Sequence, residues 1–173
     1  SNTTNNNSAF GYKALTANTT GAFNVAVGYI SLQSNTRGSY NTAVGYNSLS
    51  ANTFGNYNSA FGYKALNSNT TGNRNSAFGY SSLRLNTIGV RNAAFGYAAM
   101  LYNTTGNNNS AFGTMALYQN TTGTNNTAIG YNSMYFNTIG QNNTSVGHQA
   151  LYSNTTDSNS AFGFQTLYSN VIG

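Results

Sequence analysis

Very few side chains in this sequence could carry out acid–base, nucleophilic or metal chemistry. Asp157 is the one acidic residue, His148 is the one imidazole, and there is no Cys. General acid–base catalysis needs a pair of positioned titratable groups, and a catalytic triad needs a base beside its Ser. Metal sites need several His, Cys, Asp or Glu ligands. We therefore expect a chain that is not an enzyme and that holds no cofactor or metal.

The net charge of +5 arises from scarce acids rather than from a basic patch. Only 4% of residues are charged, where about 25% is usual. Nucleic-acid binding usually needs clustered Lys and Arg, so no nucleic-acid partner is expected. No apolar run approaches the roughly 18 residues of a membrane helix, and no membrane insertion is expected. The six cations are scattered over the N-terminal half: Lys13, Arg37, Lys64, Arg74, Arg84 and Arg91.

The acidic, basic and His residues all lie within a sequence repeat that covers the chain. The stretch "NSAFGYKAL" occurs at residues 7–15 and again at 58–66. Glycines recur in steps of 17 from Gly11 to Gly147, and the last, Gly163, follows after 16. Asn stands four residues before each of these glycines, and Leu or Met four residues after. Residues 1–173 therefore read as one repeat array.

The repeat unit predicts an all-β fold. Each unit carries Gly among Asn, Ser, Thr and Tyr, which are weak helix formers, and 17 residues cannot hold two helices and their turns. We expect a parallel β-solenoid (a β-roll or β-helix) of about ten coils, each with a strand on "SAFGYxAL" and turns at Asn and Gly. Stacked at about 4.8 Å per coil, the array is a rod of roughly 48 Å in which each residue lies over its equivalent in the next coil.

The columns formed by equivalent residues predict the core. The residue before each Gly is never polar, and we expect this column to be buried together with the Leu/Met column. The expected core residues are Phe10, Val27, Val44, Phe61, Phe78, Phe95, Phe112, Ile129, Val146, Phe162, Leu15, Leu66 and Leu117.

The opposite face of the strand holds only small residues, which are Ala and Gly except for Ser145. Two interpretations stay open: another sheet or chain packs closely against this face, or the coil interior is narrow and has room only for Ala. The residues of this close-packing face are Ala9, Ala43, Ala60, Ala77, Gly62 and Gly79.

Polar and aromatic columns have structural and functional interpretations. Asn favours turns and forms amide ladders, His148 replaces a Tyr as a packing variant, and Asp157 lies in a turn. The Tyr columns could stack on sugar rings, and an unbroken Thr column from Thr19 to Thr155 could bind ice. N-T-T segments are sequons that a turn could present for glycosylation, at Asn18, Asn69, Asn103, Asn120 and Asn154.

The motif N-[S/T]-A-[F/V/I]-G-Y-x-[A/S]-L resembles the head repeats of trimeric autotransporter adhesins and the "NTAVGY" arrays of phage-type tail fibres, over all ten units. The adhesin resemblance implies a parallel β-roll whose chains pack into a homotrimer and act in surface attachment. The unit here is longer than the usual adhesin coil, and we expect no stalk, anchor or fibre chaperone domain within residues 1–173.

These features together predict a structural protein. Neither terminal unit reads as a polar cap, so we expect either a piece of a longer array or a subunit that stacks end to end. The expected function is an extracellular fibre, or the shaft of an adhesin or tail fibre, at the cell surface or on a virion. Its expected partners are itself, as a filament or homotrimer, and host-surface or matrix glycans. The alternative is a ligand-binding solenoid that uses the Thr column for ice or the Tyr columns for carbohydrate.

Overall fold

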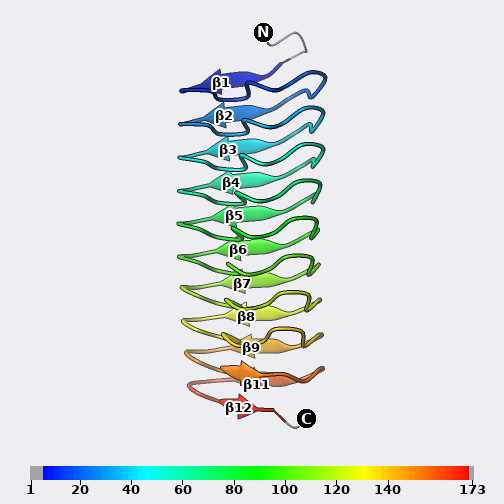
Figure 1. The fold of residues 1–173 in the computed structure, drawn as a ribbon. Helices are drawn as coiled ribbons and strands as arrows, with labels where there is room; N and C mark the ends of the chain where they lie inside the picture. Colours follow the sequence, from blue (N-terminus) through cyan, green and yellow to red (C-terminus); the bar gives the residue numbers. More distant parts are fainter. Residues whose placement is uncertain (1–5, 172–173) are drawn as a thin grey trace.

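The chain is a parallel β-solenoid in which about ten coils stack along one axis (Figure 1). The computed structural model describes residues 6–171. One ten-stranded parallel sheet runs the length of the rod in the order β1 to β9 and then β11, and β10 pairs with β12 in a second, two-stranded sheet. The strands are β1 (Ser8–Phe10), β2 (Val25–Val27), β3 (Thr42–Val44), β4 (Ser59–Phe61), β5 (Ser76–Phe78), β6 (Ala93–Phe95), β7 (Ser110–Phe112), β8 (Thr127–Ile129), β9 (Thr144–Val146), β10 (Ser153–Asn154), β11 (Ser160–Phe162) and β12 (Ser169–Asn170).

The register of the sheet follows the sequence repeat. Each strand residue pairs with the residue 17 positions on, as in Ala77 with Ala94, and the offset falls to 16 where β9 meets β11. Hydrogen bonds between coils continue outside the strands: the Leu83 amide donates to the Ala99 carbonyl at 2.9 Å, and the Thr87 amide donates to the Thr104 carbonyl at 2.9 Å. On several sides of each coil, backbone N–H and C=O groups are therefore hydrogen-bonded to the neighbouring coil.

Left-handed backbone makes the corners of each coil. Three positions per coil hold non-glycine residues with φ between 46° and 63°, and in the fifth coil these are Arg74, Ser81 and Leu83. Such angles are uncommon for residues other than Gly, Asn and Asp. Each strand ends at a glycine such as Gly79, with φ 132°, where an added Cβ would meet the Gly96 carbonyl oxygen. The 17-residue coil is therefore narrow and tightly turned.

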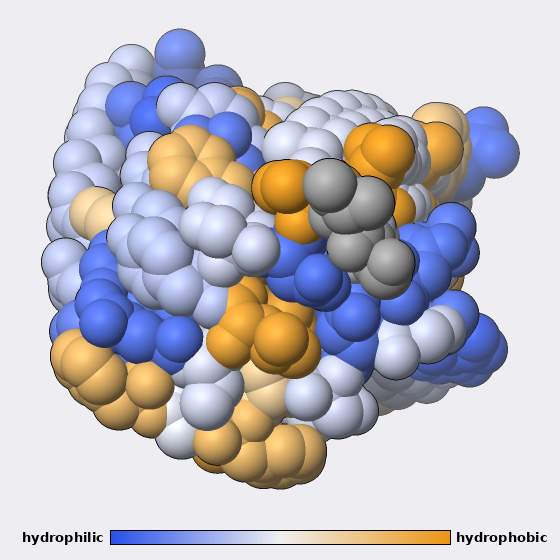
Figure 2. Space-filling view, turned by 90° about the horizontal axis from the view of Figure 1, so that it is seen from below, coloured by the Kyte–Doolittle hydropathy of each residue, from blue (hydrophilic) through white to orange (hydrophobic). Residues whose placement is uncertain are grey.

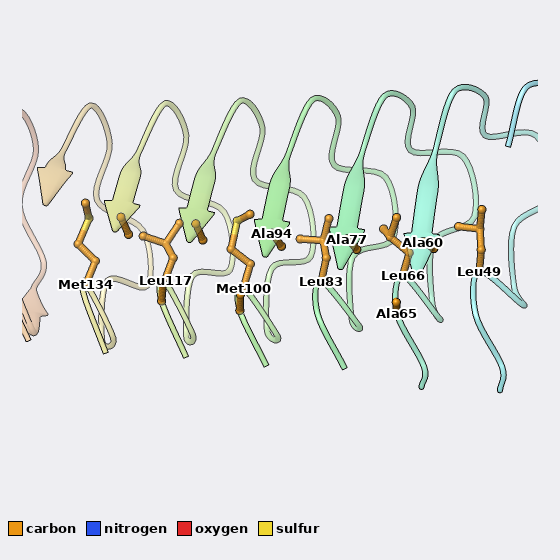
Figure 3. Packing of buried hydrophobic residues seen from close by; sticks show 14 of the residues in the cluster. Leu49, Ala60, Ala65, Leu66, Ala77, Leu83, Ala94, Met100, Leu117 and Met134 are labelled. Atoms are coloured by element: carbon orange, nitrogen blue, oxygen red, sulfur yellow. The ribbon is translucent and has the colours of Figure 1, made fainter. Parts of the chain in front are cut away.

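The interior contains one Leu or Met and one or two small residues per coil. The Leu/Met side chains point across the coil toward the Ala side chains of the sheet (Figure 3). Leu83 and Ala77 are both 0% exposed. The prediction that Leu15, Leu66 and Leu117 belong to the core is confirmed.

Two columns of Asn fill the rest of the interior. In the first, the Asn86 side-chain amide donates to Asn69 Oδ1 at 2.8 Å and to the Gly89 carbonyl at 3.1 Å. In the second, Asn75 Oδ1 accepts from the Asn92 backbone N–H at 3.0 Å. A side-chain amide both donates and accepts hydrogen bonds, so each Asn can pair with the coils on either side of it without carrying a charge. Buried polar groups need such hydrogen-bond partners.

The prediction that the residue before each Gly is buried is wrong. Strand alternation turns the central Ala inward and its two neighbours outward, and an interior that places Ala opposite Leu has no room for a second large side chain. These residues lie on the outer surface of the sheet, exposed or half-buried, at Phe10, Val27, Val44, Phe61, Phe78, Phe95, Phe112, Ile129, Val146 and Phe162.

The Ala column is explained by the narrow-interior alternative rather than by a neighbouring chain. Ala43, Ala60 and Ala77 face their own coil and are fully buried, whereas Ala9, in the first coil, is exposed. Gly62 and Gly79 are half-buried, and each lies against the backbone of the following coil of the same chain. Of the two interpretations left open by the sequence, the narrow interior is the one that these residues fit.

Candidate functional site: the outward ladders

Aromatic side chains form stacked ladders on the outside of the rod. Neighbouring rings from Tyr12 to Tyr97 have centroids 4.8–5.3 Å apart. A second ladder, from Phe61 to Phe112, has centroid spacings of 4.6–4.9 Å. Seen from below, along the rod, apolar side chains lie on the perimeter among hydrophilic ones (Figure 2). The solenoid thus displays apolar columns to solvent along its length.

Stacking determines what these rings can bind. Tyr46 and Tyr63 are stacked with an interplanar angle of 10° and are 44% and 38% exposed. The faces of each ring lie against the rings above and below, so its edge and hydroxyl are what solvent meets. A sugar stacks on an open aromatic face, and the interior of these ladders offers none. The geometry therefore does not favour carbohydrate stacking on the Tyr columns.

The Thr column takes part in the backbone hydrogen bonding of the coils. The Thr70 hydroxyl donates to the Thr87 carbonyl at 3.1 Å, and the Thr87 hydroxyl donates to the Thr104 carbonyl at 3.1 Å. These side chains are half-buried. Their protons point along the rod axis, so they do not form a free, ordered row of donors toward ice.

The predicted sequon Asn residues lie inside the coil. They form the first Asn column, and their amide nitrogens donate to the preceding Asn and to a nearby carbonyl, as in Asn69 to Asn52 Oδ1 and to the Gly72 carbonyl, both at 3.0 Å. A glycan on this nitrogen cannot be accommodated in the folded coil. The prediction that turns present these residues to solvent is wrong for Asn18, Asn69, Asn103, Asn120 and Asn154, all of which are buried.

The two titratable residues singled out in the sequence have structural roles. The His148 ring stacks between Tyr131 and Phe164, at centroid distances of 5.1 and 5.2 Å. Asp157 Oδ1 accepts a hydrogen bond from the Gln141 backbone N–H at 2.7 Å, as Asn73 Oδ1 does from the Asn56 N–H. Between residues 6 and 171, no three His, Cys, Asp or Glu side chains gather as a metal site.

A third ladder, near the C-terminal end, alters the acidity of its phenols. Tyr118 and Tyr135 stack at 4.8 Å, and Tyr135 and Tyr152 at 5.3 Å. Burial raises the pKa of Tyr118 above its ordinary value, and a hydrogen bond with Tyr102 adds to the rise. Burial also raises the pKa of Tyr152. The ladder therefore favours neutral phenols.

Cations rest on some of the exposed rings. Lys64 Nζ lies 5.1 Å from the centroid of the Tyr63 ring, and Arg74 Cζ lies 5.9 Å from that of Tyr57. Such contacts contribute about 0.5–1 kcal/mol at exposed sites. No role for a cation could be predicted from the sequence, because the column and neighbours of each cation become visible only when the coils are stacked.

Comparison of the chain with protein families, with curated proteins and with solved structures finds no match. Within the described residues no helix is long and apolar enough to cross a membrane.

Proposed function

We propose that this chain is a non-enzymatic shaft of an extracellular fibre, of the adhesin or tail-fibre kind, whose rods associate side by side. The observation that carries the proposal is the outward column of Phe, Val and Ile, which stays apolar in all ten coils although it faces solvent. Solvent alone does not require this, and large exposed apolar patches mark interaction sites. The Tyr column, two residues further on, widens the patch.

The surface has the size and composition of a protein interface. We define the apolar face as the outward sheet residues together with the Tyr column, from Ser76 to Tyr80 in the fifth coil. At the spacing of strands and residues in a sheet it covers about 16 Å by 48 Å, or roughly 800 Å². A standard interface buries about 800 Å² per partner. No charged residue occurs in these columns, and interface cores are likewise depleted of charge.

A second copy of the chain is the partner that fits this face best. Its side chains recur once per coil, at about 4.8 Å along the axis. Only a partner with the same rise stays in register over the whole length, and a copy of the same solenoid has it. Chain–chain packing through the apolar face replaces the packing through Ala and Gly that the sequence had indicated.

Sedimentation velocity over a range of concentrations tests the proposal. We expect the wild-type chain to associate, and a Phe61→Ser, Phe78→Ser, Phe95→Ser variant to stay monomeric with an unchanged fold by circular dichroism. The control is Ile88→Ser, because Ile88 is apolar and exposed but lies outside the apolar face. A wild-type chain that is monomeric throughout, or a control that loses association as the triple variant does, would overturn the proposal. Electron microscopy of the associated wild type should show bundled rods.

A further inference from the structure

In one exposed column, the type of side chain changes along the rod. This column lies two residues before each sheet strand, at one of the left-handed corners. Its members are Asn6, Phe23, Tyr40, Tyr57, Arg74, Arg91, Asn108, Asn125, Asn142 and Ser158, and all of them are exposed. Three stacked aromatic rings are thus followed by two guanidinium groups and then by three amides.

The two arginines stack as like charges on successive coils. The Arg74 backbone N–H donates to the Asn56 carbonyl and that of Arg91 to the Asn73 carbonyl, both at 3.0 Å, which holds the two residues one coil apart. Like charges placed directly opposite on neighbouring strands are destabilising. This placement is costly in a chain that otherwise avoids charge, and it calls for a compensating anion.

Within residues 6–171, neither guanidinium donates a hydrogen bond or forms an ion pair, so no group there supplies that anion. The only acidic side chain, Asp157, lies in the coil four below that of Arg91, about 19 Å away at the coil spacing. That distance exceeds the Debye length of about 8 Å at physiological salt. The ten N–H donors of the pair therefore face solvent.

The pair borders a preformed hollow of about 360 Å³, lined by Asn56, Tyr57, Asn73, Arg74, Val90 and Arg91. Its walls are fixed: the Asn73 amide donates to the Thr71 carbonyl at 2.9 Å, and Asn73 Oδ1 accepts from the Asn56 backbone N–H at 2.7 Å. The Arg74 guanidinium rests over the Tyr57 ring. Because the Asn groups are engaged within the protein, the charged donors that remain for a ligand are those of the arginines.

We propose that the Arg74–Arg91 hollow binds an oxyanion, and that its ligand is the sulfate or carboxylate group of an acidic polysaccharide. A guanidinium presents paired N–H donors that match two oxygens of such a group, and two of them on successive coils can hold one group between them. The exposed amides from Asn108 onward offer donors and acceptors to the hydroxyls of the same sugar chain. This site does not depend on lateral association through the apolar face.

A nucleic acid fits the site less well. Single-stranded nucleic acids bind by stacking bases on free aromatic faces, and here Tyr40 and Tyr57 stack on each other at 4.9 Å while Arg74 covers the next face.

Fluorescence anisotropy at physiological salt tests the site with labelled heparin (sulfated), alginate (carboxylated), dextran (neutral) and single-stranded DNA. We expect heparin or alginate to bind and dextran not to bind, and which of the two acidic chains binds tells sulfate from carboxylate. Arg74→Gln with Arg91→Gln should weaken the binding at least tenfold. Arg74→Lys with Arg91→Lys keeps the charge but removes the paired N–H donors of the guanidinium groups. It should weaken the binding by less than the double glutamine variant does.

The matched control is Lys13→Gln with Lys64→Gln, which removes the same charge from another corner and should leave binding unchanged. Equal loss in both glutamine variants, binding of DNA alone, or no binding of either acidic polysaccharide would overturn the proposal. Both arginines are exposed, so melting temperatures should not fall in their variants. Sedimentation of the Arg variants should match the wild type, which separates this test from that of the apolar face.

Discussion

Replacing one amide of the inner Asn column by a carboxylate is a demanding test of the interior. In Asn86→Asp the isosteric side chain keeps its acceptor for the Asn103 amide, at 2.8 Å. It loses both N–H donors and directs an oxygen at Asn69 Oδ1 and at the Gly89 carbonyl. In the wild type these two oxygens lie 2.8 and 3.1 Å from the Asn86 amide nitrogen. The variant therefore replaces two attractive contacts by two repulsive ones.

The magnitude follows from these partners. Asn69 Oδ1 is left unpaired, which costs roughly 1–3 kcal/mol, whereas the Gly89 carbonyl keeps the Asn75 amide as a donor at 2.8 Å. The unpaired buried charge adds to that cost. The folded state raises the pKa of the new carboxyl above its unfolded value of about 3.9. A raised pKa means that stability is greatest below the unfolded pKa and is lost as the pH rises through the folded pKa.

Chemical denaturation as a function of pH measures this effect. We expect Asn86→Asp to be strongly destabilised at neutral pH and to recover part of its stability at about pH 3–4, where the protonated acid can donate one of the two lost hydrogen bonds. The control is Asn125→Asp, at an exposed left-handed position that Asp tolerates, and it should be nearly silent. If Asn86→Asp and Asn125→Asp cost the same at neutral pH, the inner Asn column is not buried as described.

Two further predictions concern the corners and the Tyr ladder. Ile30 is β-branched and holds φ 48°, so Ile30→Gly should stabilise the fold by about 1 kcal/mol; a thermal melt checks this, and Ile88→Gly, at a position without positive φ, should show no gain. Because the pKa values of Tyr118 and Tyr152 are raised in the fold, the stability they contribute is complete below about pH 10 and is lost as the pH rises above it. Tyr118→Phe with Tyr152→Phe should therefore flatten the alkaline loss in melts from pH 8 upward; an equal loss in wild type and variant would show that other groups cause it.

The sequence predicts the solenoid because the length of the sequence repeat equals the offset between residues that pair in neighbouring coils. Equivalent residues 17 apart must lie over one another, so the Leu column, the ring contacts of His148 and the turn position of Asp157 all follow from alignment. The shift to a 16-residue step also predicts where β9 and β11 change offset.

The inside and outside of the strand could not be predicted in the same way. Hydrophobicity ranks Phe above Ala as a core residue, yet the width of the coil decides which of them fits, and that width depends on left-handed corners at residues such as Leu83 and Ser81. Residue preferences give no warning of these angles. The Asn residues were expected at turns, but their paired donors and acceptors allow them to fill the interior.

Ala and Leu face inward while the Phe column faces outward, and the reactivity of thiols placed at these positions tests this arrangement. The chain has no Cys, so Phe78→Cys, Ala77→Cys and Leu83→Cys each report on a single site. In dilute protein, where rods are separate, we expect the thiol at position 78 to react with a thiol reagent at nearly the rate of a free peptide. The thiols at 77 and 83 should react at least roughly a hundredfold more slowly, because they wait for the coil to open. Rapid labelling at 77 and 83 together with protection at 78 would contradict the account.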